Sequence, residues 1–285
     1  MTTSATSTTS STPAPAIPVR GAHAGQPTPL RILGRATRSE LIKLGTVRST
    51  GWVLLLAALS IVGIGVINAV GILVQLRQQP GSQPPTLDPA GAALSGIGAA
   101  LVAVAALGIL SVTADYSSGM IRTTIAAVPR PAYLVLARTG ALISYVLPVA
   151  VGSTVLTFLA NKIILSAAGV TISFAEPGVA RAVVGGGLYL TVLAVFAAGL
   201  GWLLRSTAGA LVTWLALWLV PTLLIMLFPQ SIAERVGPWL PANAGTAIYQ
   251  LGVSEAAAWA SLAGFAGYGV VLMVLAALLL RHRDA

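Results

Sequence analysis

The sequence predicts an all-α protein that crosses a membrane six times. Of its 285 residues 56% are hydrophobic and only 8% are charged, and the charges bracket six apolar runs. Each run has roughly the 20 residues that a helix needs to cross about 30 Å of hydrocarbon. The backbone of these runs must be helical, because lipid offers no hydrogen-bond partner to a free N–H or C=O group.

The composition excludes several classes of function. The chain has no cysteine and two histidines, His23 and His282, one near each end. Disulfides, cysteine nucleophiles and histidine-ligated metal sites inside the membrane are therefore excluded, and we expect no catalytic residue, metal or cofactor. Neither Lys43 nor Lys162 ends a Gly-x-x-x-x-Gly-Lys-Ser/Thr loop, so the chain has no phosphate-binding loop for ATP. Its net charge of +9 does not indicate nucleic acid, because the basic residues lie at the ends of apolar runs.

The chain begins with a polar tail and an amphipathic segment. Residues 1–29 are rich in Ser, Thr, Pro and Ala, which predicts a disordered tail ahead of a membrane domain over 30–285. The stretch "RILGRATRSELIKLGTVRST" then alternates apolar residues with Arg and Lys. Basic side chains are attracted to anionic lipid, so we expect a helix that lies in the plane of the membrane.

The six apolar runs predict spans at 50–74, 91–114, 139–161, 182–204, 207–228 and 257–280. The fourth and fifth are separate, because an arginine at the bilayer centre costs about 3 kcal/mol and Arg205 lies between them. "RST" at this point predicts a tight turn, with Ser206 or Thr207 as the N-cap of the fifth span.

Two loops contain further short helices. The stretch "TADYSSGMIRTTIAAVPRP" between spans two and three predicts a short amphipathic helix, capped by Asp115 or Ser117 and stopped by Pro129. From spacing alone it either floats on the lipid surface or docks into a partner. The loop over 229–254 predicts short helices at the outer interface before span six.

The basic residues predict the orientation. If the N-terminus is cytoplasmic, all 16 Lys and Arg residues fall on the cytoplasmic side except Arg77, Lys162, Arg181 and Arg235. This asymmetry fits the positive-inside rule, and an even number of spans returns the C-terminus to the same side. We therefore expect a multi-pass protein of the cytoplasmic membrane with both termini inside.

Four segments together resemble the actinobacterial type-2 ABC exporter permeases. They are "RSELIKLGTVRSTGW" before span one, "ADYSSGMIRTTIAAVPRP" between spans two and three, "LLRSTAGAL" between spans four and five, and "WLPANAGTAIYQ" before span six. Their order and spacing agree with a six-span permease over 30–283. The chain departs from the pattern at Gly45 and at Pro131, where basic residues are common.

The resemblance implies a transport subunit, not an enzyme, that works with a separate ATP-binding cassette subunit and pairs with itself or a second permease. It implies that the loop between spans two and three is a coupling helix on the ATPase. Asp115 would cap this helix, Gly119 would permit close approach, and Arg122, Thr123 and Thr124 would make polar contacts. Glu40 and Lys43 would belong to an elbow helix near the same ATPase.

The substrate is constrained by what the spans lack. Polar side chains are few there and no carboxylate is central, which disfavours a proton-coupled carrier. A hydrophobic or amphiphilic substrate fits this lining, although helix packing uses the same residues. The sequence leaves open an alternative without an ATPase, either a small homo-oligomeric channel or an immunity or scaffold protein.

Overall fold

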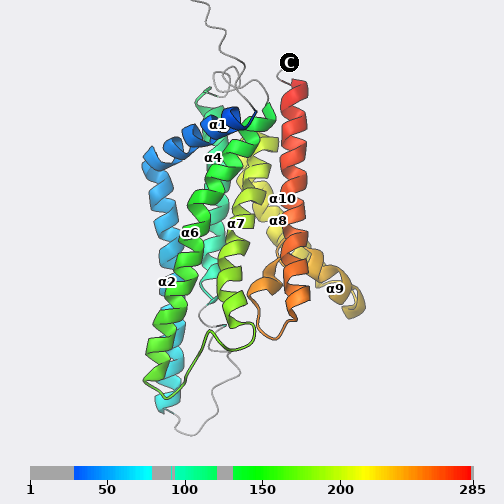
Figure 1. Cartoon of the computed structure of the whole chain (residues 1–285). Helices are drawn as coiled ribbons and strands as arrows, with labels where there is room; N and C mark the ends of the chain where they lie inside the picture. Colours follow the sequence, from blue (N-terminus) through cyan, green and yellow to red (C-terminus); the bar gives the residue numbers. More distant parts are fainter. Residues whose placement is uncertain (1–28, 79–90, 92–93, 121–130, 284–285) are drawn as a thin grey trace, which may run out of the picture.

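The computed structural model describes residues 29–78, 91, 94–120 and 131–283, and over these residues the chain is helical and has no strand (Figure 1). Six helices are long and apolar enough to cross a membrane, which confirms the predicted number. They are α2 (Arg48–Gln78), α4 (Ile97–Ser117), α6 (Pro131–Ser166), α7 (Val179–Leu204), α8 (Thr207–Ile225) and α10 (Glu255–Arg283). The protein is thus an all-α, multi-pass membrane protein.

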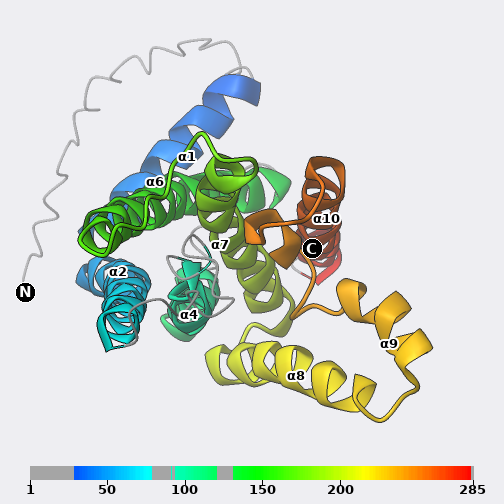
Figure 2. The ribbon, with the colours of Figure 1, turned by 90° about the horizontal axis from the view of Figure 1, so that it is seen from below.

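Helix α7 is the centre of the bundle. Figure 2 looks along the bundle and shows α7 between α4, α6, α8 and α10. Most of its residues are buried, and small residues bring its neighbours close. A methyl group on Gly187 would lie only 2.6 Å from the backbone nitrogen of Val151 in α6. The backbones of α6 and α7 therefore touch at a point where only glycine fits.

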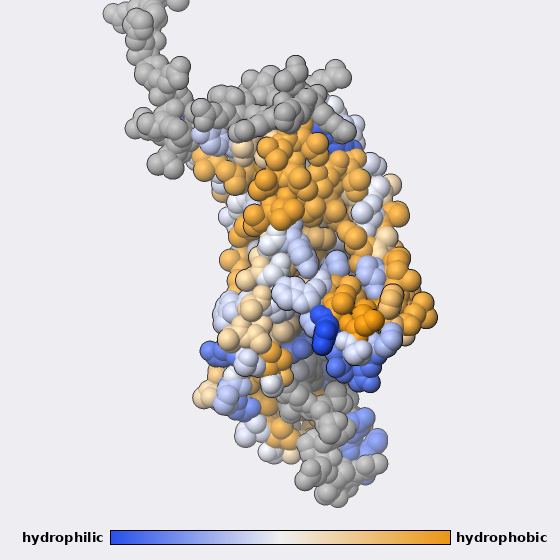
Figure 3. Space-filling model, turned by 90° about the vertical axis from the view of Figure 1, so that its right-hand side faces the viewer, coloured by the Kyte–Doolittle hydropathy of each residue, from blue (hydrophilic) through white to orange (hydrophobic). Residues whose placement is uncertain are grey.

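The peripheral helices expose apolar side chains. Val212 and Leu223 in α8 are 67% and 61% exposed, and Trp52 and Ile67 in α2 are 69% and 71% exposed. Figure 3 shows apolar residues covering the upper part of the face on which α10 lies. Exposing so many apolar side chains to water would cost free energy, whereas exposing them to lipid does not. The exposure therefore agrees with a membrane location.

Helix α1 (Pro29–Thr46) lies across one end of the bundle (Figure 1). It packs against α6, where the Tyr145 hydroxyl donates to the Leu41 carbonyl oxygen at 3.1 Å. Gly45 leaves room for this tyrosine, because a side chain at that position would meet the Tyr145 hydroxyl. The position at which the sequence lacks a basic residue is therefore a packing point between α1 and α6.

Three short helices precede α10: α9 (Gln230–Val236), η1 (Gly237–Trp239) and η2 (Thr246–Tyr249). Arg181 near the start of α7 holds the last of them. One guanidinium nitrogen donates to the carbonyls of Ala247 and Ile248 at 3.1 and 2.8 Å, and the other donates to those of Gln250 and Val253. Four hydrogen bonds from one arginine thus join the loop before α10 to α7, and the Tyr249 ring packs on that of Tyr189 beside them.

The predicted turn between spans four and five is confirmed. Arg205 ends α7 in the left-handed region with φ 53°, and its N–H donates to the Gly201 carbonyl. Ser206 is the N-cap of α8 and accepts a hydrogen bond from the Gly209 N–H at 3.3 Å. A polar side chain that accepts from the first turn is what lets α8 begin directly after α7 ends.

Helix α6 extends beyond both ends of the predicted span three. Helix α6 begins at Pro131 and ends at Ser166, whereas the charges at Arg138 and Lys162 predicted 139–161. Proline suits the first position of a helix, because it has no N–H to leave unpaired. Both charged residues lie inside the helix, and Arg138 is neutralised there by acidic side chains.

Candidate functional site

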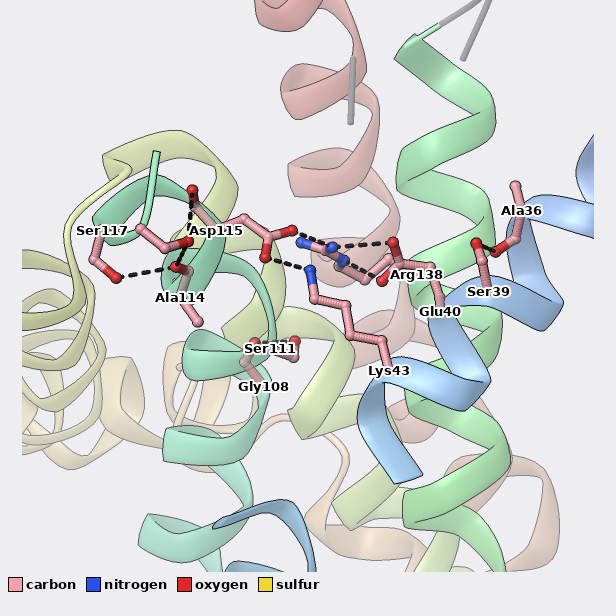
Figure 4. Close-up of polar contacts among 11 residues, drawn as sticks. Ala36, Ser39, Glu40, Lys43, Gly108, Ser111, Ala114, Asp115, Ser117 and Arg138 are labelled. Atoms are coloured by element: carbon pink, nitrogen blue, oxygen red, sulfur yellow. Dashed lines mark hydrogen bonds and ion pairs between the residues drawn. The ribbon is translucent and has the colours of Figure 1, made fainter. Parts of the chain in front are cut away.

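Four charged side chains from three helices meet at the end of the bundle covered by α1 (Figure 4). Arg138 in α6 donates from Nε and Nη2 to the two carboxylate oxygens of Glu40 in α1, at 2.8 and 3.1 Å. Its Nη2 also bonds to one oxygen of Asp115 in α4, and Lys43 in α1 bonds to the other. We call these four residues the ion network. Its two acids and two bases give no net charge.

The network is almost fully buried. The side chains of Arg138 and Asp115 are each 2% exposed and that of Glu40 is 7% exposed, whereas Lys43 retains 34%. The Arg138 guanidinium also lies 5.5 Å from the centroid of the Trp202 ring in α7. Charges removed from water are tolerated only when they are paired in this way, because an unpaired ion there carries a large desolvation cost.

One atom of the network has no hydrogen-bond partner. Nη1 of Arg138 is buried and unpaired among the described residues. The electron-rich face of the nearby Trp202 ring partly compensates for it, as such faces attract guanidinium groups.

The network joins the two helix ends between which the chain segment from α4 to α6 runs. Asp115 lies in the last turn of α4, and Arg138 lies two turns into α6. The segment between them, which includes the undescribed residues 121–130, is therefore attached at both ends to one point. Through Glu40 and Lys43 the same point is fixed to α1. Movement of this segment would act on three helices together.

A second contact joins the start of α8 to the same end of α4. The Thr207 hydroxyl donates to that of Thr113 at 2.7 Å. The Arg205 guanidinium lies 5.4 Å from the centroid of the Tyr116 ring, which packs edge-on against Trp202. Because Trp202 also contacts Arg138, the turn between α7 and α8 is continuous with the ion network.

The structure brings together three of the residues that the sequence singled out. Glu40 and Asp115 both bind Arg138, and Lys43 binds Asp115 directly. The structure gives Asp115 a different position from a cap: it lies inside α4, and both of its oxygens are bound to basic side chains. The predicted coupling helix itself lies outside the described residues, and so do Arg122, Thr123 and Thr124.

Gly119 lies just beyond the end of α4. Its φ is +70°, and its N–H donates to the Tyr116 carbonyl at 3.3 Å. Glycine at this position closes a helix, because it adopts the left-handed conformation without a steric cost. A side chain there would meet none of the described residues within 4 Å. With respect to those residues, Gly119 is thus needed for its backbone conformation and not for lack of space.

Sequence reasoning missed Arg138, which it treated only as the boundary of a span. A signal was present, because Pro131 is a favoured first residue of a helix and Arg138 follows two turns later. An arginine so placed lies inside a helix, not at its end, and needs an acidic partner. Among the described residues, no group of three or more His, Asp or Glu side chains is arranged to hold a metal ion.

No family model, no curated protein and no solved structure matches this chain. What the site does must therefore be inferred from its own geometry.

Proposed function

We propose that this chain is the transmembrane permease subunit of an ATP-driven ABC exporter whose ATP-binding subunits are separate proteins. The observation that carries the proposal is the ion network, which fixes both ends of the segment between α4 and α6 and fastens them to α1. A segment that transmits force from a partner must be firmly attached to the helices that are to move. The resemblance of four sequence segments to type-2 exporter permeases supports the same function.

The ion network is suited to transmit movement because breaking its buried ion pairs costs much free energy. Removing one member of a buried ion pair destabilises a protein by about 3–5 kcal/mol, since the remaining charge is left unpaired. A push on the segment is therefore more readily passed to α1, α4 and α6 than absorbed locally. In this proposal the segment between α4 and α6 contains the coupling helix, with Arg122, Thr123 and Thr124 on the ATPase.

The charge distribution supports an orientation. In this proposal α1 is an elbow helix in the cytoplasmic interface, with Glu40 and Lys43 on the side of the ATPase. Both termini are cytoplasmic, and α9, η1 and η2 lie at the outer surface. The unit of function contains two permeases, identical or different, and two ATP-binding subunits.

The interior supports a hydrophobic or amphiphilic substrate. Three buried hydroxyls are used within their own helices: those of Ser153, Thr157 and Thr191 donate to backbone carbonyls four residues earlier at 2.7 to 2.8 Å. They offer little to a polar substrate, which would need free donors and acceptors to replace its water.

Purification of the tagged chain from its native membrane in mild detergent tests this function. We expect a protein with a Gly-x-x-x-x-Gly-Lys-Ser/Thr loop to copurify in a stoichiometric amount. The complex should hydrolyse ATP, and the chain alone should not, because it has no such loop. Proteoliposomes of the chain alone that conduct ions, with no ATPase recovered, would favour the channel alternative instead.

A further inference from the structure

A groove runs along the bundle between α6, α7 and α10. Its volume is about 470 Å³, which is within the roughly 300–1,000 Å³ of small-molecule sites in proteins. Small residues hollow it out: Ala132 in α6 and Ala266, Gly269 and Ala277 in α10. A hollow of this size between three helices has room for a ligand.

The walls of the groove suit hydrocarbon. Apart from Thr139 and Thr191 its lining is apolar, and both hydroxyls are already used. Thr139 donates to the Val135 carbonyl and Thr191 to the Gly187 carbonyl, each at 2.8 Å. Neither hydroxyl has a hydrogen left to donate, so water or a polar ligand would lose most of its own hydrogen bonds on entering.

The groove has the length of one leaflet. Its lining extends from Ala132 to Ile143 on α6 and from Ala266 to Ala277 on α10. At 1.5 Å per residue each wall is about 16 Å long, roughly half of the 30 Å hydrocarbon core. The two helices run in opposite directions, so one end of the groove lies where α6 begins and α10 ends (Figure 1).

The groove opens sideways. Leu136, Val270 and Val274 line it and are more than half exposed. This side belongs to the apolar surface that the bundle presents to its surroundings, where Val271 and Leu278 of α10 are exposed as well. A chain from the surrounding bilayer reaches the groove without passing through the protein.

Positive charge lies beyond one end of the groove. Helix α10 continues past Ala277 for one to two turns and has Arg281 and Arg283 in its last turn. A turn is about 5.4 Å, so these residues belong to the level at which the hydrocarbon gives way to headgroups. Arginines at that level attract anionic lipid.

We propose that the groove binds one acyl chain of an anionic bilayer phospholipid, with the headgroup at the end of α10. The length of the groove, its apolar walls, its lateral opening and the arginines at its end together define this occupant. The site needs only that the protein lies in a membrane, so it stands or falls independently of any ATPase partner.

Native mass spectrometry of the full chain in detergent tests the binding. The probes are phosphatidylglycerol and phosphatidylcholine with the same acyl chains, added to delipidated protein. We expect a first phosphatidylglycerol bound at least about fivefold more tightly than phosphatidylcholine, a preference that the double variant Arg281→Gln, Arg283→Gln reduces. Equal binding of the two lipids would overturn the assignment of an anionic headgroup.

Variants that fill the groove test its location. Ala266→Leu and Ala277→Leu each add bulk to a wall, whereas Ala263→Leu adds the same bulk to an exposed position on α10 outside the groove. We expect the first two to weaken phosphatidylglycerol binding at least about tenfold and the third to leave it unchanged. Binding that is the same in all three variants would place the lipid elsewhere. Competition by glycerol 3-phosphate, which has no acyl chain, would likewise contradict a site built on hydrocarbon.

Discussion

Arg138 in α6 binds Asp115 in α4, which stands 23 positions earlier in the sequence. The segment that connects the two helices lies between these two residues. Both side chains are 2% exposed, and Glu40 and Lys43 of α1 complete the network around them. Three helices and the two ends of one segment thus depend on a single guanidinium group. This relationship makes the segment a fixed part of the bundle at both of its ends.

Replacing Arg138 with Gln should destabilise the protein by about 3–5 kcal/mol, because the buried Glu40 would lose its basic partner and Asp115 would keep only Lys43 among the described residues. The matched control is Arg235→Gln, since Arg235 is an exposed residue of α9. Unfolding in mixed micelles, followed by tryptophan fluorescence, measures the difference, and Trp202 lies beside the guanidinium. Equal stability of the two variants would show that the network contributes nothing to the fold.

Gly187→Ala should destabilise the bundle by about 1–3 kcal/mol, because the new methyl group would press against the backbone of Val151. Gly152 offers a matched control in α6, since a side chain there would meet nothing within 4 Å. Gly152→Ala should be neutral or slightly stabilising, as alanine favours a helix more than glycine does. Thermal unfolding of both variants in the same detergent provides the comparison. A neutral Gly187→Ala would mean that α6 and α7 do not pack backbone to backbone.

Much of the fold follows from composition, because a helix is the structure that a long apolar run adopts in lipid. Arg205 marks the end of a helix, and the turn there is as predicted. Arg138 does not mark an end, because it is paired with acidic side chains inside α6, which begins at Pro131. In the sequence, the proline seven residues earlier is the signal that distinguishes Arg138.

The candidate site was found in part for the same reason. Glu40, Lys43 and Asp115 are polar residues next to apolar spans, and this contrast marks them in the sequence. Their pairing with Arg138 depends on how α1 packs across α4 and α6, and no local pattern encodes that packing. The conformation of Gly119 follows from its place after the last turn of α4, which becomes evident only once the helix end is known.

Gly119 permits a test that separates backbone conformation from contact with a partner. Leu at φ +70° costs roughly 1–2 kcal/mol, whereas Asn tolerates this conformation better. A side chain at this position meets none of the described residues within 4 Å. If an ATPase approaches Gly119 closely, both variants should lose ATPase activity in the copurified complex while still inserting into the membrane. Full activity of Gly119→Asn would contradict close approach and leave only the conformational role.

Cysteine labelling tests the orientation, since the chain has no cysteine of its own. Ser231 in α9 and Ser118 at the end of α4 are both exposed. In intact cells an impermeant maleimide should label Ser231→Cys and should not label Ser118→Cys until the membrane is opened. The reverse pattern would invert the topology and place the segment between α4 and α6 outside, away from any cytoplasmic ATPase.

The most direct test of the account is the dependence of ATPase recovery on Arg122, in the segment that the ion network fixes at both ends. Arg122→Glu reverses a charge at the proposed contact, where juxtaposed like charges cost several kcal/mol. Arg235→Glu makes the same change at an exposed position of α9, on the surface proposed to lie outside the cell. With yields normalised to the amount of chain in the membrane, we expect Arg122→Glu to copurify at least about tenfold less ATPase activity than the parent chain does. Arg235→Glu should retain the activity of the parent. Equal recovery by both variants would contradict a coupling role for this segment.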